Sequence, residues 1–370
     1  LDNYWNTGLY GGVMKDCDVM IKKGVEQDQP HFVGIAKVLM AGALGQVACI
    51  WGDAPYSNAF LGTENLKPSY DSQEQLYASI QTLLDEAIVE LAKDAVPGGP
   101  NAASDLIFSG DAAKWTATAH ALKARYYMHL TKRDAAAHTK ALGELELAFT
   151  SNNNQPDFEF DNAAAFANPL AQFGAQRPGT IIMNAGFVAK LAGDPRAGLI
   201  HAGDAFYNTG DSLLWSRNSS PSPLISYAEV KFLEAEAQLR AGQGEAANTA
   251  LRAAITANMD YYGVDGEVYL GSVSDISGAA LEAGLEVIMA ESYKALYGQA
   301  AVEVWTNYRR TGYPALTPNP NGSNGNNPSG ILPRRIIYPQ NERVTNLESL
   351  NAAIANQGGA LLDDDLWAFN

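Results

Sequence analysis

The chain has 370 residues, enough to bury a large core in one big domain or two, and its 46% hydrophobic and 18% charged residues are typical of a globular protein. Its 41 acidic residues outnumber the 25 basic ones and give a net charge of −16. This balance argues against nucleic acid or an anionic membrane surface as the main partner, because both need clustered lysine and arginine.

We expect no segment of this sequence to cross a membrane. The longest apolar run, Val38 to Trp51, contains glycines and Gln46 and is shorter than the roughly 20 residues that a bilayer requires. No signal peptide is visible, and the opening LDNYWNTGLY reads as folded sequence. We therefore expect the natural N-terminus to lie further upstream.

Helical spacing dominates the first half of the sequence. A clear apolar stripe begins at Gln75 and ends before the Pro-Gly-Gly-Pro sequence at 97–100. Asp111 is the expected N-cap of a helix that runs through Leu130, and a further helix is expected at 135–149.

The clearest repeat unit is the stretch 227–257. One helix stops at Gly242, a residue suited to a left-handed C-cap, and a second helix starts at once. Alanines on both helices permit close packing, and the pair resembles a tetratricopeptide repeat of about 34 residues. The stretch 112–149 resembles a second copy and 13–51 a looser third. Because the copies are irregular and far apart, we expect no uniform solenoid.

These patterns predict a mainly α fold, a tetratricopeptide-like helical-repeat scaffold with a loop-rich, irregular second part packed on it. Segments rich in Asn, Gly, Pro and aromatic residues indicate the second part, and such segments commonly carry function. We expect one unit, 1–370, with the scaffold mainly in 10–150 and 223–310 and the loop-rich part mainly in 151–222, 259–277 and 311–370.

The sequence lacks the motifs of common enzyme classes. It has no P-loop, no convincing GxGxxG between a strand and a helix, no GxSxG and no HExxH. His120 and His129 are nine residues apart, about 180° around a shared helix, whereas zinc sites use closely spaced ligands. We expect no catalytic residue, no metal site and no cofactor.

Cysteines and clustered acids have ordinary explanations. Cys17 and Cys49 lie at different distances from the turn between their helices, so we expect two small buried side chains and no disulfide. Asp363, Asp364 and Asp365 are expected to be solvated surface, and a surface calcium site is the alternative.

Aromatic residues give the better indication of function. Sugars present apolar C–H faces that stack on aromatic rings. Rings at helix ends or in loops are Trp5, Trp51, Tyr56, Phe60, Tyr207 and Trp215, and core packing is the alternative for each. Trp115 and Trp305 lie inside helical patterns, where core packing is expected.

Two arginine pairs, Arg309–Arg310 and Arg334–Arg335, flank a loop of Asn, Gly and Pro. Each pair is followed by a Tyr-Pro step. A guanidinium offers five fixed donors, so in an acidic chain we expect these arginines to pair internally with carboxylates and backbone carbonyls.

Four stretches in sequence order resemble the SusD/RagB family of outer-membrane nutrient-binding lipoproteins. The first, 36–60, is similar to a family helix that ends in an aromatic-Gly-Asp-x-Pro turn, here Trp51 to Pro55. The second, LISYAEVKFLEAEAQLRAG, matches a helix with Tyr-Ala-Glu before Ala-Glu-Ala. The third comprises VEVWTNYRRTGYPAL and LPRRIIYPQNERVTN, and the fourth is the C-terminal DDDLWAFN. The resemblance covers the chain from about residue 30 to its end.

The resemblance implies a lipid-anchored protein on the outer-membrane surface. Such a protein captures a nutrient, commonly an oligosaccharide, and delivers it to a SusC-like TonB-dependent transporter without a catalytic step. The lipid-bearing N-terminal cysteine of the family is missing here, so anchoring is implied by the family alone. The C-terminal segment also has one tryptophan where the family commonly has a pair.

We assign structural and ligand-binding residues on this basis. Asp53 and Pro55 are expected to end a helix, and the four arginines to meet Glu229, Glu234 and Glu236. Ligand contacts are expected from loop residues, with rings stacking on sugar faces and Asn and Arg bonding hydroxyls: Tyr56, Asn58, Phe60, Tyr207, Trp215, Arg217 and Asn218.

Two other functions stay open at this point. One is a tetratricopeptide-type scaffold that binds a peptide or protein, although the long aromatic insertions favour a glycan. The other is a helical glycoside hydrolase, which needs two carboxyl groups facing each other, about 5 Å apart in retaining enzymes. Adjacent acids such as Glu234 and Glu236 do not establish such a pair.

Overall fold

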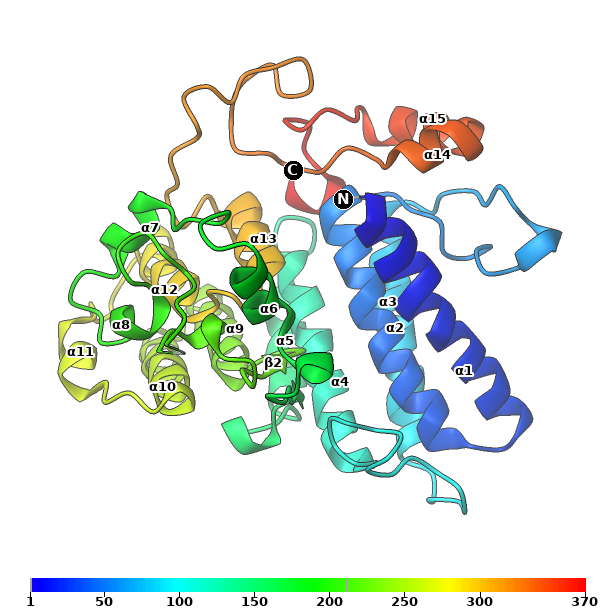
Figure 1. Cartoon of the computed structure of the whole chain (residues 1–370), viewed down its shortest axis with the longest axis horizontal. Coiled ribbons are helices and arrows are strands. Elements are labelled where there is room, and N and C mark those ends of the chain that lie inside the picture. The colour runs from blue at the N-terminus through cyan, green and yellow to red at the C-terminus, as the bar shows by residue number, and fades with distance from the viewer. Residues whose placement is uncertain (1, 211) are drawn as a thin grey trace. The chain divides into compact units, whose positions relative to one another are not determined.

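The computed structural model describes residues 2–210 and 212–370, and the described chain is mainly helical, as predicted (Figure 1). Its two-stranded sheet pairs β1 (Asp157–Phe158) with β2 (Ser222–Pro223) in antiparallel register. Contacts divide the chain into two compact units. The first unit comprises Leu1–Asn101, Gly110–Ala148 and Val302–Asn370, and the second comprises Ala102–Ser109 and Phe149–Ala301.

Successive helices pack side by side in the first unit, as Figure 1 shows for α1 to α3. Local signals set their ends: Ser72 and Gln75 form a capping box at the start of α3, and Asp111 caps α4 as predicted, accepting a hydrogen bond from the Lys114 amide. The helices are η1 (Tyr4–Val13), α1 (Met14–Glu26), α2 (Pro30–Trp51), α3 (Gln73–Leu91), α4 (Ala112–His129), α5 (Ala137–Leu145), α13 (Ala301–Thr311), α14 (Gln340–Thr345) and α15 (Leu347–Gln357), with short turns η2 (Gly62–Glu64) and η6 (Trp367–Phe369).

Helix α2 forms the core of the first unit. It is longer than the apolar run in the sequence suggests, and its 22 residues are long and apolar enough to span a membrane. However, 83% of its most apolar stretch is buried within the protein, which is typical of a core helix. Gly45 permits close approach of α4, because a Cβ there would lie 2.0 Å from the Tyr126 hydroxyl.

The second unit contains the predicted repeat pair. Helices α9 and α10 pack on each other, and Gly242 between them is left-handed at φ 73°. Helix α10 continues beyond the predicted end through Tyr262 and stops at the left-handed Gly263. The other helices are short or follow this pair: α6 (Pro169–Gln176), α7 (Ala185–Lys190), α8 (Ala197–Ile200), α9 (Tyr227–Arg240), α10 (Gly244–Tyr262), α11 (Glu267–Ser272) and α12 (Leu281–Ala295), with η3 (Asn152–Asn154), η4 (Ala164–Phe166) and η5 (Leu214–Ser216).

A buried charge network fixes the irregular 151–222 segment to these helices. The fully buried Arg196 donates to both carboxylate oxygens of Asp194, at 2.9 and 2.7 Å, and to Asn258 of α10 at 2.7 Å. Glu291 of α12 lies 3.6 Å from the same guanidinium. A buried guanidinium is tolerated only with such partners, so this segment is held in one arrangement although it contains little helix.

Candidate functional site

A cavity of about 190 Å³ lies in the second unit, where η5 and the turn after it meet the end of α10. Aromatic, hydroxyl and guanidinium groups share its wall. The lining residues are Leu214, Trp215, Arg217, Ser219, Ser220, Pro221, Tyr261 and Tyr262. Two of the predicted ligand residues, Trp215 and Arg217, therefore lie in one concave site.

Tyr261 and Tyr262 supply the accessible rings of this cavity. Both rings are half-buried, with centroids 5.4 Å apart. The Tyr261 hydroxyl donates to Asp157 at 3.1 Å, and the Tyr262 hydroxyl accepts from Gln299 at 2.5 Å. Burial raises the pKa of Asp157 to about 6, although its hydrogen bonds to Gln155 and Tyr261 oppose the rise. These bonds fix both rings.

Sequence reasoning did not single out Tyr261 and Tyr262. Their Tyr-Tyr dipeptide falls in the segment expected to be loop, but both residues lie on the last turn of α10. The signal that could have identified them is the Gly263 that follows, because a left-handed C-cap places the preceding aromatic residues at a helix end.

Trp215 contributes more to the core than to the cavity. Its side chain is 4% exposed and packs in a cluster with Phe187, Leu191 and Leu214. Gly298 lies against its indole, so that a Cβ at position 298 would be 2.1 Å from Nε1. Most of the Trp215 ring is therefore packed in the core, which was the alternative for this residue. Only its small exposed part could stack on a ligand.

The other predicted residues of the second unit surround the same turn. Arg217 is half-buried, and its Nη2 donates to the Ser212 carbonyl at 3.3 Å. Asn218 accepts from the Asn168 amide at 2.7 Å through its own carbonyl. Tyr207 packs over Gly174 and on the core cluster, and neither Asn218 nor Tyr207 lines the cavity.

Tyr56, Asn58 and Phe60 lie in the first unit, on the loop after α2. The carboxylate of Asp71 accepts from the Tyr56 amide at 3.0 Å and thereby shapes the loop. Asn58 donates to Ser69 at 2.8 Å, while its buried Oδ1 has no hydrogen-bond partner among the described residues. Phe60 has a positive φ of 61°, which is uncommon for a bulky residue.

The Phe60 ring has fixed neighbours. It stacks on Tyr10 with centroids 6.1 Å apart, and the Lys15 ammonium lies 5.9 Å from its centroid. The loop therefore presents an aromatic surface that already has a partner on one side. Tyr10 is a contributor that the sequence analysis did not name.

Asp53 and Pro55 make the contacts expected of structural residues. The buried Asp53 carboxylate accepts from the Gln73 amide and from Asn356, both at 2.8 Å. The Pro55 carbonyl accepts from the Tyr10 hydroxyl at 2.7 Å. Together these bonds connect the end of α2 with α3, α15 and η1.

Main-chain carbonyls are the principal partners of Arg309 and Arg335. Arg309 donates to the carbonyl of Cys49 at 2.6 Å and of Arg334 at 3.0 Å, and its guanidinium lies between the rings of Trp305 and Phe369. Arg335 donates to the carbonyls of Trp51 and Gly359, at 2.8 and 3.0 Å.

The carboxylates expected to meet the arginines have neighbours of their own. Arg310 donates to Asn307, Glu234 pairs with Lys231 at 2.6 Å and Glu236 with Arg240 at 2.7 Å. The amide of Glu229 donates to the capping Ser226. Contact of the arginines with these glutamates stays a prediction, because the two sets of residues belong to different units.

Cys49, His129 and Glu303 form a buried cluster that the sequence analysis missed. Their donor atoms lie within 4.8 Å of one another. His129 Nε2 lies 2.7 Å from Glu303, whereas Nδ1 faces the Tyr77 hydroxyl at 3.0 Å and Cys49 Sγ at 3.4 Å. No sequence signal indicates this cluster, because its members come from three separate helices.

We read this cluster as a hydrogen-bonded network. The two ring nitrogens point to opposite partners, so one metal ion cannot engage Cys49 and Glu303 through the same imidazole nitrogen. The Arg309 guanidinium also adds positive charge next to Cys49, which opposes a cation. Cys17 and Cys49 are free, buried thiols.

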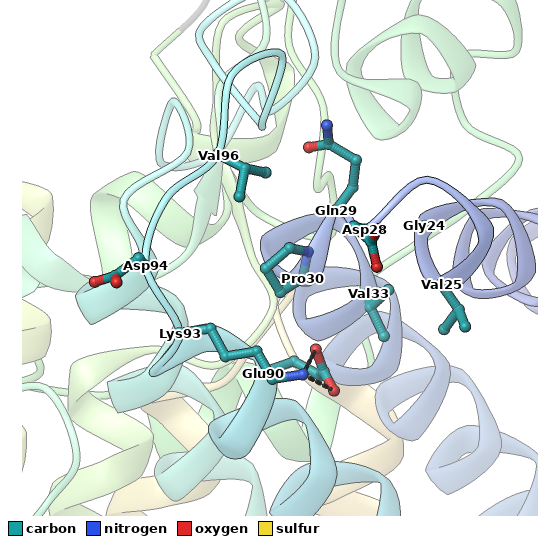
Figure 2. Close-up of a pocket in the computed structure, with 10 residues that line it drawn as sticks. All are labelled: Gly24, Val25, Asp28, Gln29, Pro30, Val33, Glu90, Lys93, Asp94 and Val96. Atoms are coloured by element: carbon teal, nitrogen blue, oxygen red, sulfur yellow. Dashed lines mark hydrogen bonds and ion pairs between the residues drawn. The ribbon is translucent and has the colours of Figure 1, made fainter.

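A second cavity, of about 360 Å³, lies in the first unit between the turn after α1 and the end of α3. Figure 2 shows Lys93 and Glu90 turned toward each other, in an ion pair of 2.7 Å, and Asp94 pointing away. A neighbouring cavity shares Gly24 and Gln29 with it. Among the described residues that line the cavity in Figure 2 none is aromatic, so these residues offer no stacking surface for a sugar.

Comparisons with known proteins place the chain in a family. A family profile, SusD-like_2, described as "Starch-binding associating with outer membrane", matches residues 1–210 and 196–339. A search of curated protein sequences finds no match.

Solved structures resemble the whole chain. A chitin-binding SusD homolog from Flavobacterium johnsoniae has a TM-score of 0.83 at 23% identity, over 100% of this chain and 88% of that one. A SusD/RagB family protein from Bacteroides thetaiotaomicron has a TM-score of 0.78 at 26% identity, over 100% and 87%. Since the family profile matches most of the sequence, the chain belongs to the SusD/RagB-like family.

Proposed function

We propose that this protein captures an oligosaccharide at the surface of the outer membrane and delivers it to a SusC-like TonB-dependent transporter. The observation that carries the proposal is the cavity of the second unit, where two fixed tyrosine rings, serine hydroxyls and a guanidinium share one wall. The family description, which names starch binding and the outer membrane, supports it. The chitin-binding relative has the same fold.

The groups of the cavity match the chemistry of a sugar. The rings of Tyr261 and Tyr262 offer faces for its C–H groups, while Arg217 and the exposed Ser219 offer hydrogen bonds to its polar substituents. Tyr56, Asn58 and Phe60 offer a second contact surface in the first unit.

Binding without catalysis is part of the proposal. Hydrolysis of a glycosidic bond needs two carboxyl groups at the sugar. Among the described residues that line the cavity, none is aspartate or glutamate. Incubation with the bound oligosaccharide, followed by product analysis, is expected to show no cleavage. Cleavage that survives repurification of the protein would favour the hydrolase instead.

A glycan screen of the purified protein, followed by calorimetry, tests the binding function. Tyr261→Ala and Tyr56→Ala are expected to weaken binding of the selected glycan. Val268→Ala, at a 91% exposed position on α11, is the matched control and is expected to bind as the wild type does. Binding of unrelated peptides but of no glycan would overturn the proposal in favour of a peptide-binding scaffold.

Transporter delivery and surface anchoring need their own test. In cells that carry the full-length gene, we expect the protein to copurify with a TonB-dependent transporter and to be accessible to protease added outside the cell. An exclusively periplasmic protein without such a partner would contradict this part of the proposal.

A further inference from the structure

The Tyr261 hydroxyl connects the cavity of the second unit to a carboxylate outside its lining. Tyr261 lines the cavity, and its hydroxyl donates to Asp157 at 3.1 Å. Asp157 is half-buried and belongs to β1, whereas Tyr261 belongs to the last turn of α10. The ring that the cavity presents to a ligand is therefore held by a group that the ligand need not touch.

Hydrogen bonds also fix the Asp157 carboxylate itself. The buried Gln155 donates from Nε2 to both carboxylate oxygens, at 2.9 and 3.0 Å. The Oε1 atom of Gln155 accepts from the amide of Tyr227, the first residue of α9, at 2.9 Å. The carboxylate thus lies in a chain of bonds from the start of α9 to the end of α10, which allows it to position the Tyr261 ring.

The strand pair that carries Asp157 also leads into the cavity wall. Asp157 of β1 pairs with Pro223 of β2 in antiparallel register. Pro221, two residues before Pro223, lines the cavity. The bond between Asp157 and Tyr261 therefore helps to set the place of the tyrosine ring relative to the Pro221 part of the wall.

The surroundings of Asp157 make this bond sensitive to pH. Burial raises the pKa of the carboxyl group to about 6, although its two hydrogen-bond partners oppose the rise. Glu159, two residues along the chain, adds negative charge that raises the pKa further. Helix α10 contributes the two tyrosines of the cavity, α9 approaches through the Tyr227 amide, and β2 contributes serine and proline, which carry no charge.

We propose that Asp157 is a positioning residue for glycan binding: its ionised carboxylate holds the Tyr261 ring in the orientation that stacks on a sugar, so that binding weakens when the carboxylate is protonated. A hydrogen bond to an ionised acceptor is roughly twice as strong as one to a neutral acceptor. A ring that is held less firmly has to be ordered when the sugar binds, which lowers the affinity. The inference rests on the proposed glycan-binding function and adds its regulation by pH.

Calorimetry with sugars that do not titrate tests the pH dependence. The probes are the neutral trisaccharides of glucose, galactose, mannose and N-acetylglucosamine. We expect those that bind to do so about twofold to tenfold more weakly at about pH 5 than at about pH 7.5. Because the ionised form binds better, binding near pH 6 also releases protons, which appear as a heat that depends on the ionisation enthalpy of the buffer.

Three variants assign the effect to Asp157 and Tyr261. Asp157→Asn keeps the shape of the side chain without its charge, so at about pH 7.5 it is expected to bind as the wild type does at about pH 5, without pH dependence. Tyr261→Phe keeps the ring but lacks the bond, and the same result is expected. Asp260→Asn removes a charge from the exposed neighbouring position of α10 and is expected to retain the affinity and pH dependence of the wild type. A pH dependence that persists in Asp157→Asn would place the titrating group elsewhere and overturn the inference.

Thermal unfolding separates an effect on binding from an effect on folding. Because burial raises the pKa of Asp157, the stability that this group contributes is fully present below the ordinary aspartate value of 3.8 and is lost as the pH rises through about 6. Asp157→Asn is therefore expected to unfold at no lower temperature than the wild type near neutral pH. Weaker binding by this variant then reflects the position of Tyr261.

The outcomes also separate the inference from the function on which it rests. Binding of a trisaccharide with equal affinity at both pH values and without proton release would overturn the inference and leave glycan capture standing. Binding of no trisaccharide at either pH would contradict glycan capture itself, and the inference with it. Tighter binding at the lower pH would show that protonation of the site favours the ligand, which is the reverse of the proposal.

Discussion

His129 on α4 and Glu303 on α13 form an ion pair of 2.7 Å in the core of the first unit, with 2% and 6% of their side chains exposed. Burial alone would lower the pKa of His129, but the fields of Cys49 and Glu303 outweigh it and raise the pKa to about 9. Burial alone would raise the pKa of Glu303, but His129 and Arg125 outweigh it and lower the pKa to about 2.

These shifts predict how stability depends on pH. Because the folded-state pKa of His129 is raised, the stability that this group contributes is fully present below the ordinary histidine value of 6.5. This contribution is lost as the pH rises through about 9. Because the folded-state pKa of Glu303 is lowered, the stability that this group contributes is fully present above the ordinary glutamate value of 4.5. This contribution is lost as the pH falls through about 2. The contribution of the pair is therefore greatest between these two ordinary values, which thermal unfolding across pH would show.

Glu303→Gln is expected to lower the free energy of unfolding by about 3 kcal/mol near neutral pH, because it removes one partner of a buried ion pair. It is also expected to reduce the loss of stability above neutral pH, since Glu303, one of the two groups that raise the pKa of His129, is then neutral. Glu86→Gln is the matched control, because Glu86 pairs with Lys37 at a side chain that is 53% exposed. If the stability of Glu303→Gln falls above neutral pH as steeply as that of the wild type, the ion pair does not control this loss.

Arg309 and Arg334 each begin an Arg-Arg pair, but we expect them to contribute unequally to the free energy of unfolding. Arg309→Lys keeps the charge but loses the bonds to two carbonyls and the stacking between Trp305 and Phe369, so we expect a loss of about 2–4 kcal/mol. Arg334→Lys is expected to cost under about 1 kcal/mol, because Arg334 is half-buried and lies 3.7 Å from Asp365. Denaturant unfolding measures both, and equal losses would contradict this account.

Local signals explain why the helices could be predicted. The Asp111 cap, the Gly242 break and the spacing of the α9–α10 pair all depend on residues within a turn or two of each other. Such signals are visible without knowledge of the tertiary structure. The extension of α10 to Tyr262 was missed because the Tyr-Tyr-Gly sequence favours a loop as well as a helix end.

Contacts between distant residues could not be predicted in this way. Cys49, His129 and Glu303 meet only when three helices pack. Trp215 was expected to contact a ligand, with core packing as the alternative, and the sequence does not show that Gly298 leaves the space in which its ring packs. Arg309 and Arg335 were expected to pair with carboxylates and backbone carbonyls, but which carbonyls they meet, those of Cys49 and Trp51 at the end of α2, depends on contacts between distant residues.

At Gly45 of α2, tight packing against α4 is expected to outweigh the helix propensity that an alanine would add. Gly45→Ala would place a Cβ 2.0 Å from the Tyr126 hydroxyl, and such overpacking costs about 1–3 kcal/mol. Gly143→Ala on α5 meets nothing within 4 Å and is expected to stabilise the protein by about 0.5–1 kcal/mol through helix propensity. Chemical denaturation compares the two, and a stabilising Gly45→Ala would show that α2 and α4 are less tightly packed than described.

Phe60 offers a way to separate binding from folding. A bulky residue at positive φ carries local strain of about 1–2 kcal/mol, which persists only where the surroundings enforce it, and such strain is found at functional sites. Here the Tyr10 ring and the Asp71-bonded loop provide the enforcing contacts. Glycine adopts this backbone without strain.

Phe60→Gly should therefore remove the ring and leave the loop conformation in place. Relief of strain offsets the lost contact with Tyr10, so we expect the free energy of unfolding to change by under about 1 kcal/mol. Loss of one stacking face is expected to weaken glycan binding by about threefold to tenfold. Phe60→Ala is the companion variant: it loses the same ring but keeps a Cβ at positive φ, so it should bind like Phe60→Gly and be less stable. If Phe60→Gly binds its glycan as tightly as the wild type, the ring serves the fold and the ligand contacts of this loop must come from Tyr56 and Asn58.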